Sequence, residues 1–159
     1  MKCAIIVLLV LVTFTLAEAQ PRVDLEKERL ELLQAHKADR EAHFKTDVDL
    51  LQLRSPDEFI AVSDGKIYRT KKADERKQFA EYFKGAKYYE WDDVEEPIVR
   101  ISKDASLAWM ITRVRVRRVQ KGASGDSERK FIYAGIMTYE KQGGRWMRVA
   151  NVSTFEILP

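Results

Sequence analysis

Hydrophobic residues in the first half of the chain recur mostly at helical spacing. The longest such stretch, 24–44, brings apolar residues and both histidines of the chain near one side of a helix. That side carries Leu25, Leu32, His36 and His43. Two shorter helices are predicted over 46–54 and 73–83, the first ended by Ser55-Pro56 and the second followed by Gly85.

Strand patterns occupy most of the remaining chain. Asp64-Gly65 favours a two-residue turn between strands at 59–62 and 66–69. From residue 88 on, long stretches rich in β-branched and aromatic residues are separated by polar or glycine-containing turns. These stretches predict four strands over 88–101, 107–119, 131–141 and 146–157. Long consecutive strands with short connections form an antiparallel meander.

The predicted order is helix, short helix, hairpin, helix and then four strands. The helices can cover one face of the sheet while the other face meets water. We therefore predict an α+β fold with three N-terminal helices packed on a mainly antiparallel sheet of about six strands.

The beginning of the chain has the pattern of a secretory signal peptide. Lys2 precedes an uncharged apolar stretch over 4–16, and Ala17 and Ala19 provide a small-x-small cleavage site. The stretch is shorter than the roughly 20 residues that a membrane-spanning helix needs. We expect a signal peptide at 1–19 and a single domain at 20–159 that is exported, periplasmic or secreted, with no membrane association after cleavage.

The charge balance of the chain argues against a nucleic-acid partner. The chain has 28 Lys and Arg residues against 25 Asp and Glu residues, a net charge of +3, with the two signs well mixed. A nucleic-acid-binding surface needs a concentrated basic patch. We therefore expect no nucleic-acid partner.

Three stretches carry a family resemblance. Residues 59–67 resemble the first hairpin of the nuclear transport factor two-like superfamily, 106–110 the start of its fourth strand, and 144–153 its closing strand. The nearest group is the SnoaL-like, cystatin-like set of small bacterial proteins. The resemblance implies a cone-shaped fold with a strongly curved sheet, an apolar cavity beneath the first helix, and homodimers packed through the outer sheet face. Members include isomerases, dehydratases, cyclases and epoxide hydrolases, and also domains without catalysis.

The closing strand departs from the family pattern. Many relatives carry an acid or a histidine there, whereas this chain has the neutral residues Ala150, Asn151 and Val152. A catalytic acid or base on the last strand is therefore not expected.

Three residues of the first helix are candidates for acid–base chemistry. His36 can transfer protons near neutral pH and Asp39 can orient its ring, which makes both candidate catalytic residues. His43, seven residues after His36, is a candidate ligand-binding residue. The alternative is that both are ordinary histidines at the helix border. Since residues seven apart on a helix are about 10 Å apart, they cannot share a metal ion directly, and we expect no metal and no cofactor.

The strand over 88–96 is acidic and aromatic. Asp92 or Asp93, buried beside aromatic rings, is an alternative catalytic base. If the turn pairs Ile101 with Leu107, Asp93 instead faces Arg115 and Glu95 faces Arg113. Cross-strand charge pairs then explain the acids without any function.

Large or polar residues on the later strands are candidates for lining the cavity. They are Trp109, Tyr133, Met137 and Asn151. A hydrophobic core needs the same residue types, and ligand cavities are themselves mostly apolar.

Three functions remain open from the sequence. The first is an exported pocket domain that binds a small apolar or amphipathic molecule without assured catalysis. The second is a small isomerase, dehydratase or cyclase that uses a pocket His or Asp. The third is a homodimeric assembly module.

Overall fold

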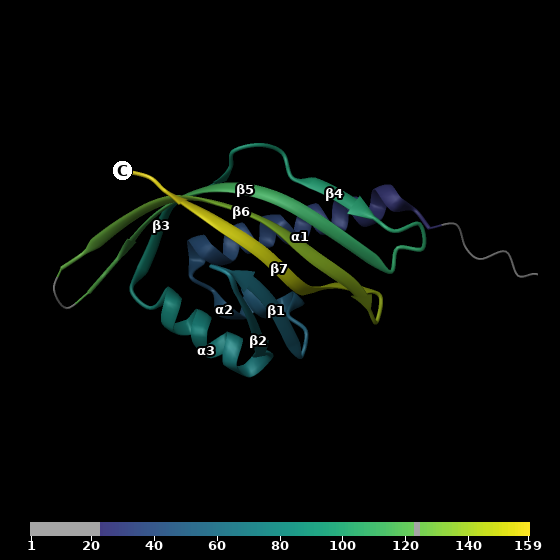
Figure 1. The fold of residues 1–159 in the computed structure, drawn as a ribbon, viewed down its shortest axis with the longest axis horizontal. Coiled ribbons are helices and arrows are strands. Elements are labelled where there is room, and N and C mark those ends of the chain that lie inside the picture. The colour runs from purple at the N-terminus through teal and green to yellow at the C-terminus, as the bar shows by residue number, and fades with distance from the viewer. Residues whose placement is uncertain (1–22, 123–124) are drawn as a thin grey trace, which may run out of the picture.

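The computed structural model describes residues 23–122 and 125–159, shown in Figure 1. The predicted signal peptide at 1–19 lies outside the described residues. The helices are α1 (Leu25–Lys45), α2 (Val48–Leu51), the short 3-10 helix η1 (Gln52–Arg54) and α3 (Lys72–Phe83). The strands are β1 (Glu58–Ser63), β2 (Lys66–Lys71), β3 (Ala86–Asp93), β4 (Ile98–Ile101), β5 (Leu107–Gln120), β6 (Ser127–Gln142) and β7 (Arg145–Ile157). None of these helices is long and apolar enough to cross a membrane.

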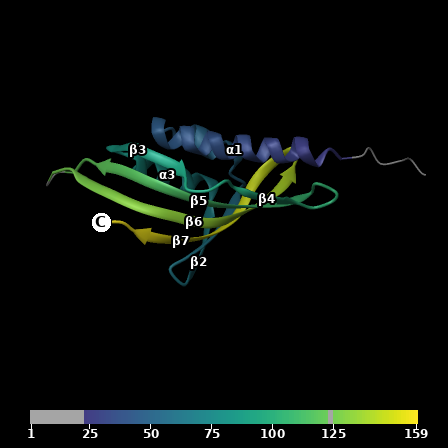
Figure 2. The same cartoon turned by 90° about the horizontal axis from the view of Figure 1, so that it is seen from above.

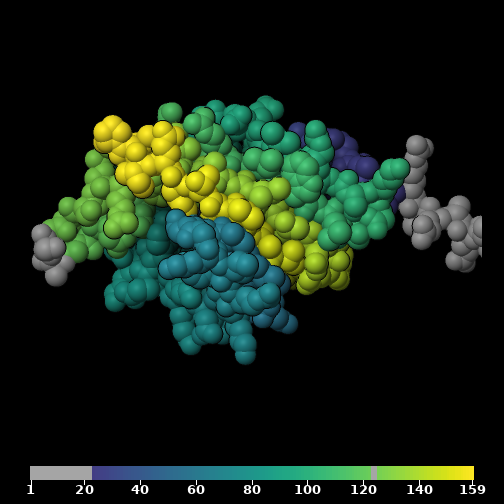
Figure 3. All heavy atoms as spheres, viewed as in Figure 1, coloured from purple at the N-terminus to yellow at the C-terminus, as the bar shows by residue number. Residues whose placement is uncertain are grey.

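The strands form one curved sheet in the order β2-β1-β7-β6-β5-β3, and β4 also pairs with β5. Every pairing is antiparallel except that of β1 with β7. Figure 2 shows α1 along one side of the sheet and β2 toward the other. Figure 3 shows the face formed by β5, β6 and β7 with the β1–β2 hairpin below them, where little of α1 is visible. The predicted α+β architecture is confirmed.

The sheet has seven strands in the described residues rather than about six, because the predicted strand at 88–101 is two strands. The chain leaves the sheet around Pro97, which has no N–H to donate to a neighbouring strand. β3 pairs with the second half of β5, and β4 pairs with the first half.

The register of β3 and β4 against β5 differs from the predicted one. Ile101 pairs with Ala108 rather than Leu107, and Asp92 rather than Asp93 lies opposite Arg115. The predicted pairs of Asp93 with Arg115 and of Glu95 with Arg113 are therefore wrong. A one-residue slip moves a side chain to the other face of the sheet, and Asp93 consequently turns toward α1.

The alternating arginines of β5 lie on the outer face with other carboxylate partners. Arg113 lies 4.0 Å from Glu156, Arg115 lies 3.9 Å from Glu90, and Arg117 lies 3.3 Å from Glu128. Because these pairs are exposed to solvent, each adds little to stability.

Two β-bulges set which side chains face α1. In the β6–β7 pairing, Tyr139 opposes Arg148 and Thr138 opposes Ala150, so Val149 is an extra residue. The bulge reverses the alternation of β7, so Arg148 and Asn151 face the same side although they are three residues apart.

The bulge in β3 has the same effect. Tyr88 opposes Arg118 and Glu90 opposes Arg117, which leaves Tyr89 as the extra residue. Tyr88 and Trp91 are consequently both buried on the inner face.

A buried polar contact docks the beginning of α1 onto the sheet. Asp24 caps the helix by accepting hydrogen bonds from the N–H groups of Glu26 and Lys27. One turn later, Glu28 accepts a 2.8 Å hydrogen bond from Trp146 Nε1 and pairs with Lys141. Burial alone would raise the pKa of Glu28, but these two donors outweigh it and hold the pKa below its usual value.

Replacing Glu28 tests this docking contact. Glu28→Ala leaves the indole N–H of Trp146 buried without an acceptor, so we expect a loss of about 1–3 kcal/mol in the free energy of unfolding. Urea denaturation followed by circular dichroism measures it. Glu31→Ala, at an exposed position of the same helix, is the control. Equal midpoints for the two variants would contradict the contact.

Candidate functional site

A cavity of about 710 Å³ lies between α1, α3 and the inner face of the sheet. Its volume falls in the range of about 300–1,000 Å³ typical of small-molecule sites. Aromatic and aliphatic side chains form most of its wall, and exposed Arg129 and Ile157 belong to its rim. The apolar wall includes Leu51, Phe59, Phe79, Trp91, Val114, Val116, Phe131, Met137 and Phe155.

A cluster of charged side chains, buried at Glu75 and half-buried at Asp39 and Arg148, interrupts the apolar wall. Arg148 of β7 lies 3.6 Å from Asp39 of α1 and 3.8 Å from Glu75 of α3. Gln52 of η1 donates a 2.9 Å hydrogen bond to Glu75. Burial raises the pKa of Asp39, although the positive charge of Arg148 counteracts it. Asp39 therefore takes up a proton more readily than an ordinary aspartate does.

His43 is a half-buried, neutral ring in this cavity. Its Nδ1 donates a 2.7 Å hydrogen bond to the main-chain oxygen of Asp39, one helical turn earlier. Its ring packs against Phe83, Tyr88 and Trp91 at centroid distances of 5.4, 5.3 and 5.0 Å. Burial lowers the pKa of His43 to about 4, so the imidazole carries no charge near neutral pH.

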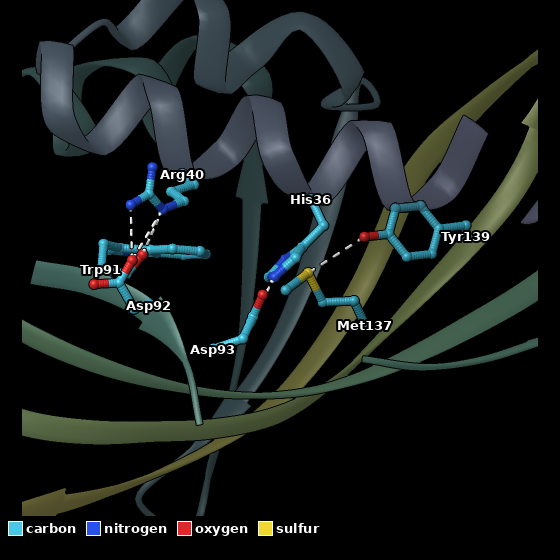
Figure 4. A network of polar contacts seen from close by, with 7 residues as sticks. All are labelled: His36, Arg40, Trp91, Asp92, Asp93, Met137 and Tyr139. Atoms are coloured by element: carbon cyan, nitrogen blue, oxygen red, sulfur yellow. Dashed lines mark hydrogen bonds and ion pairs between the residues drawn. The ribbon is translucent and has the colours of Figure 1, made fainter. Parts of the chain in front are cut away.

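Tyr133 and Asn151 meet across the β6–β7 pairing. Asn151 Nδ2 donates a 3.2 Å hydrogen bond to the Tyr133 hydroxyl, whose own proton is then available to a ligand. The Tyr133 hydroxyl lies over Gly135, where a Cβ atom would come within 2.5 Å of it. Met137 also lines the cavity and accepts a 3.5 Å hydrogen bond from the Tyr139 hydroxyl, visible in Figure 4.

His36 does not line the cavity. Figure 4 shows it reaching from α1 to Asp93 of β3. Its Nε2 lies 2.8 Å from the carboxylate oxygen, and only 4 % of His36 is exposed. On the next turn, Arg40 donates to the main-chain oxygen of Trp91 and to Asp92. These contacts hold α1 against β3, and they place His36, Asp92 and Asp93 outside the cavity wall.

Trp109 does not lie in the cavity wall, where it was predicted from the sequence. It lies on the outer face of β5, where it is 37 % exposed, because the neighbouring Ala108 and Met110 take the inner positions. It is therefore not a cavity residue. The structure brings together the other predicted residues, Asp39, His43, Tyr133, Met137 and Asn151, around one space.

Six further charged residues that line the cavity are absent from the sequence prediction. Glu128, Arg129 and Lys130 are exposed, whereas Glu75, Arg118 and Arg148 are buried or half-buried. The sequence pattern does not reveal Arg148, because strict alternation would put it on the face opposite to Asn151, and the bulge at Val149 reverses that alternation. Arg118 looks like part of the exposed arginine row of β5. In the described residues, no three His, Cys, Asp or Glu side chains gather closely enough to hold a metal ion.

Sequence comparison gives no relatives, because no family model and no curated protein matches the chain significantly. Solved structures do match. An NTF2-like protein from Cytophaga hutchinsonii superposes with a TM-score of 0.60 at 15% identity, over 80% of this chain and 97% of its own. A cystatin-like protein of unknown function from Nostoc punctiforme has a TM-score of 0.58 at 15% identity, over 86% and 94%. A ketosteroid isomerase-like protein from Erwinia carotovora atroseptica has a TM-score of 0.59 at 12% identity, over 84% and 98%.

This chain has the NTF2-like, cystatin-like fold. The resemblance predicted from its sequence is thereby confirmed at the level of the fold. Because NTF2-like folds support unrelated activities, the function has to be argued from the side chains of the cavity.

The titration of His43 tests the burial of the NTF2-like cavity wall. We expect its ring to stay neutral down to about pH 4, whereas an unfolded histidine titrates near 6.5. The unfolded chain then binds a proton that the folded chain does not, so stability is complete above pH 6.5 and falls as the pH drops toward 4.

Two-dimensional NMR of the imidazole protons measures the pKa, and His43→Phe assigns the signal by its loss. A pKa of 6 or above for His43 would contradict the burial of this wall.

Proposed function

We propose that the chain is an exported pocket domain that binds a small apolar or amphipathic molecule in the NTF2-like cavity. The observation that carries the proposal is a cavity of about 710 Å³ with mostly apolar walls and a few convergent polar groups. Export rests on the signal-peptide pattern of residues 1–19.

The polar groups support orientation of a ligand rather than nonspecific uptake. The hydroxyl of Tyr133 is held by Asn151, and Arg148 is held by Asp39 and Glu75. Fixed donors of this kind select one orientation of a ligand that carries an oxygen acceptor.

Filling the cavity tests the proposal. Ser153 of β7 lines the cavity, and Ser153→Trp places an indole inside it. We expect this variant to bind the neutral fluorescent probe N-phenyl-1-naphthylamine at least about tenfold more weakly than the original chain, a change of about 1.4 kcal/mol. Fluorescence titration measures both dissociation constants.

Thr154→Trp is the matched control, since residue 154 is exposed on the opposite face of the same strand. Equal probe affinity in the two tryptophan variants would contradict binding in the cavity. Absence of probe binding by the unmodified chain would contradict it as well.

A small isomerase, dehydratase or cyclase is the second candidate, and Asp39 is the observation that favours it. Its carboxyl lines the cavity, and burial raises its pKa toward the range of a general base. One of the structural neighbours is named ketosteroid isomerase-like. His36 has no part in this proposal, because its ring lies outside the cavity.

Proton exchange tests the catalytic role. If Asp39 abstracts a proton next to a carbonyl, the protein accelerates deuterium incorporation into small cyclic ketones in D₂O, and Asp39→Asn removes that acceleration. NMR follows the exchange, and the affinity for N-phenyl-1-naphthylamine checks that the cavity is intact. Acceleration that persists in Asp39→Asn would contradict the assignment.

Association with a second copy is a further proposal for the outer face. Leu107, Trp109, Ile111 and Val152 are apolar, and each is between 37 and 50 % exposed. They lie on the face that the family resemblance assigns to homodimers. The open cavity favours ligand binding over assembly as the primary function, and the two are compatible.

A further inference from the structure

Arg118 is a buried cation in the wall of the cavity. It projects from β5 to the cavity, and only 5 % of it is exposed. Within the described residues both of its hydrogen bonds leave from Nη1, to the main-chain oxygen of Tyr82 at 3.4 Å and to the Gln120 side chain at 3.2 Å. Its Nε is buried and has no hydrogen-bond partner among residues 23–122 and 125–159.

Arg118 also has no counter-ion in the part of the chain that the structure describes. No carboxylate there lies within 4.0 Å of its nitrogens, whereas Arg148 in the same cavity has two. The ring of Tyr82 lies 4.1 Å from the guanidinium carbon and offsets part of the cost through a cation–π contact. An arginine removed from water without a carboxylate nevertheless calls for an anion.

A second unused donor lies beside it. Tyr88 is the direct cross-strand partner of Arg118 in the β3–β5 pairing, and it lines the cavity too. Its hydroxyl is buried without a hydrogen-bond partner in the described part of the chain. Burial, reinforced by Tyr82, raises the pKa of Tyr88, so the phenol keeps its proton and remains a donor.

Two buried donors therefore converge on one side of an apolar cavity. A negatively charged acceptor satisfies both, and a planar carboxylate also matches the fork of an arginine side chain. The exposed rim residue Arg129 adds positive charge near this side, while Glu128 is engaged by Arg117. The adjoining wall is apolar, with Phe79, Val116 and Phe131.

We propose that the ligand is an amphipathic carboxylic acid whose carboxylate binds Arg118 and Tyr88 and whose apolar part lies along the cavity wall. The inference rests on the proposed function and specifies the chemistry of its ligand. Arg148 also has an Nε without a hydrogen-bond partner among the described residues, but Asp39 and Glu75 already neutralise its charge, so Arg118 is the anion site.

Matched ligands separate the anion site from the apolar cavity. Decanoic acid and decan-1-ol have the same chain length, but only the acid carries a charge near neutral pH. We expect the chain to bind the acid at least about tenfold more tightly than the alcohol, the effect of a charge-assisted hydrogen bond. Isothermal titration calorimetry measures both dissociation constants.

Variants assign the preference to named side chains. Arg118→Gln is expected to bind the two ligands equally and to keep the affinity for the alcohol, which a merely structural role of Arg118 would not produce. Tyr88→Phe keeps the ring and is expected to reduce the preference about threefold or more. Arg117→Gln, next in sequence but on the outer face, is expected to keep it fully.

The possible outcomes distinguish failure of the anion site from failure of the proposed pocket domain. Equal affinity of the unmodified chain for acid and alcohol overturns the anion site but leaves the pocket domain. Absence of binding by both ligands overturns the two together. If Arg118→Gln does not fold by circular dichroism, Tyr88→Phe decides, and an undiminished preference for the acid in that variant overturns the inference.

Discussion

The pairing of Arg148 with Asp39 and Glu75 is the constraint on which the rest of the structure depends. The three charges come from β7, α1 and α3; Glu75 is buried, and Asp39 and Arg148 are largely shielded from water. Removing one partner of such a pair leaves the other charge uncompensated at a high cost, so the two helices and the strand fix one another's position. The cavity is the space that these elements enclose, and its polar centre is therefore part of the scaffold.

Much of the fold could be predicted from the sequence, because local patterns determine it. The period of α1, the Asp64-Gly65 turn and the long alternating strands predict the observed elements and their order. Two bulges and the break at Pro97 could not be predicted, since each depends on pairing with a distant strand. These irregularities decide which residues face inward. They account for the wrong register at Asp93 and for the omission of Arg148.

The candidate site was predicted in part for the same reason. Asp39 and His43 follow from the helical period, and Tyr133 and Met137 follow from the alternation along β6. His36 satisfies the same helical period but contacts Asp93 beside the cavity, a distinction that needs the sheet in place. The polar side chains of the cavity divide into two kinds. Arg148 is paired with the carboxylates of Asp39 and Glu75, although its Nε has no hydrogen-bond partner among the described residues. Arg118 has no carboxylate partner within the same residues, and its Nε and the Tyr88 hydroxyl are unused donors there.

The central claim is that this space is kept open for a molecule that the chain carries. Native mass spectrometry of residues 20–159, purified from its own host and then stripped and re-exposed to a lipid extract of that host, tests the claim most directly. We expect one added mass of a few hundred daltons per chain, lost on stripping and regained on exposure. Spectra of the bare chain alone, both before and after exposure, would contradict it.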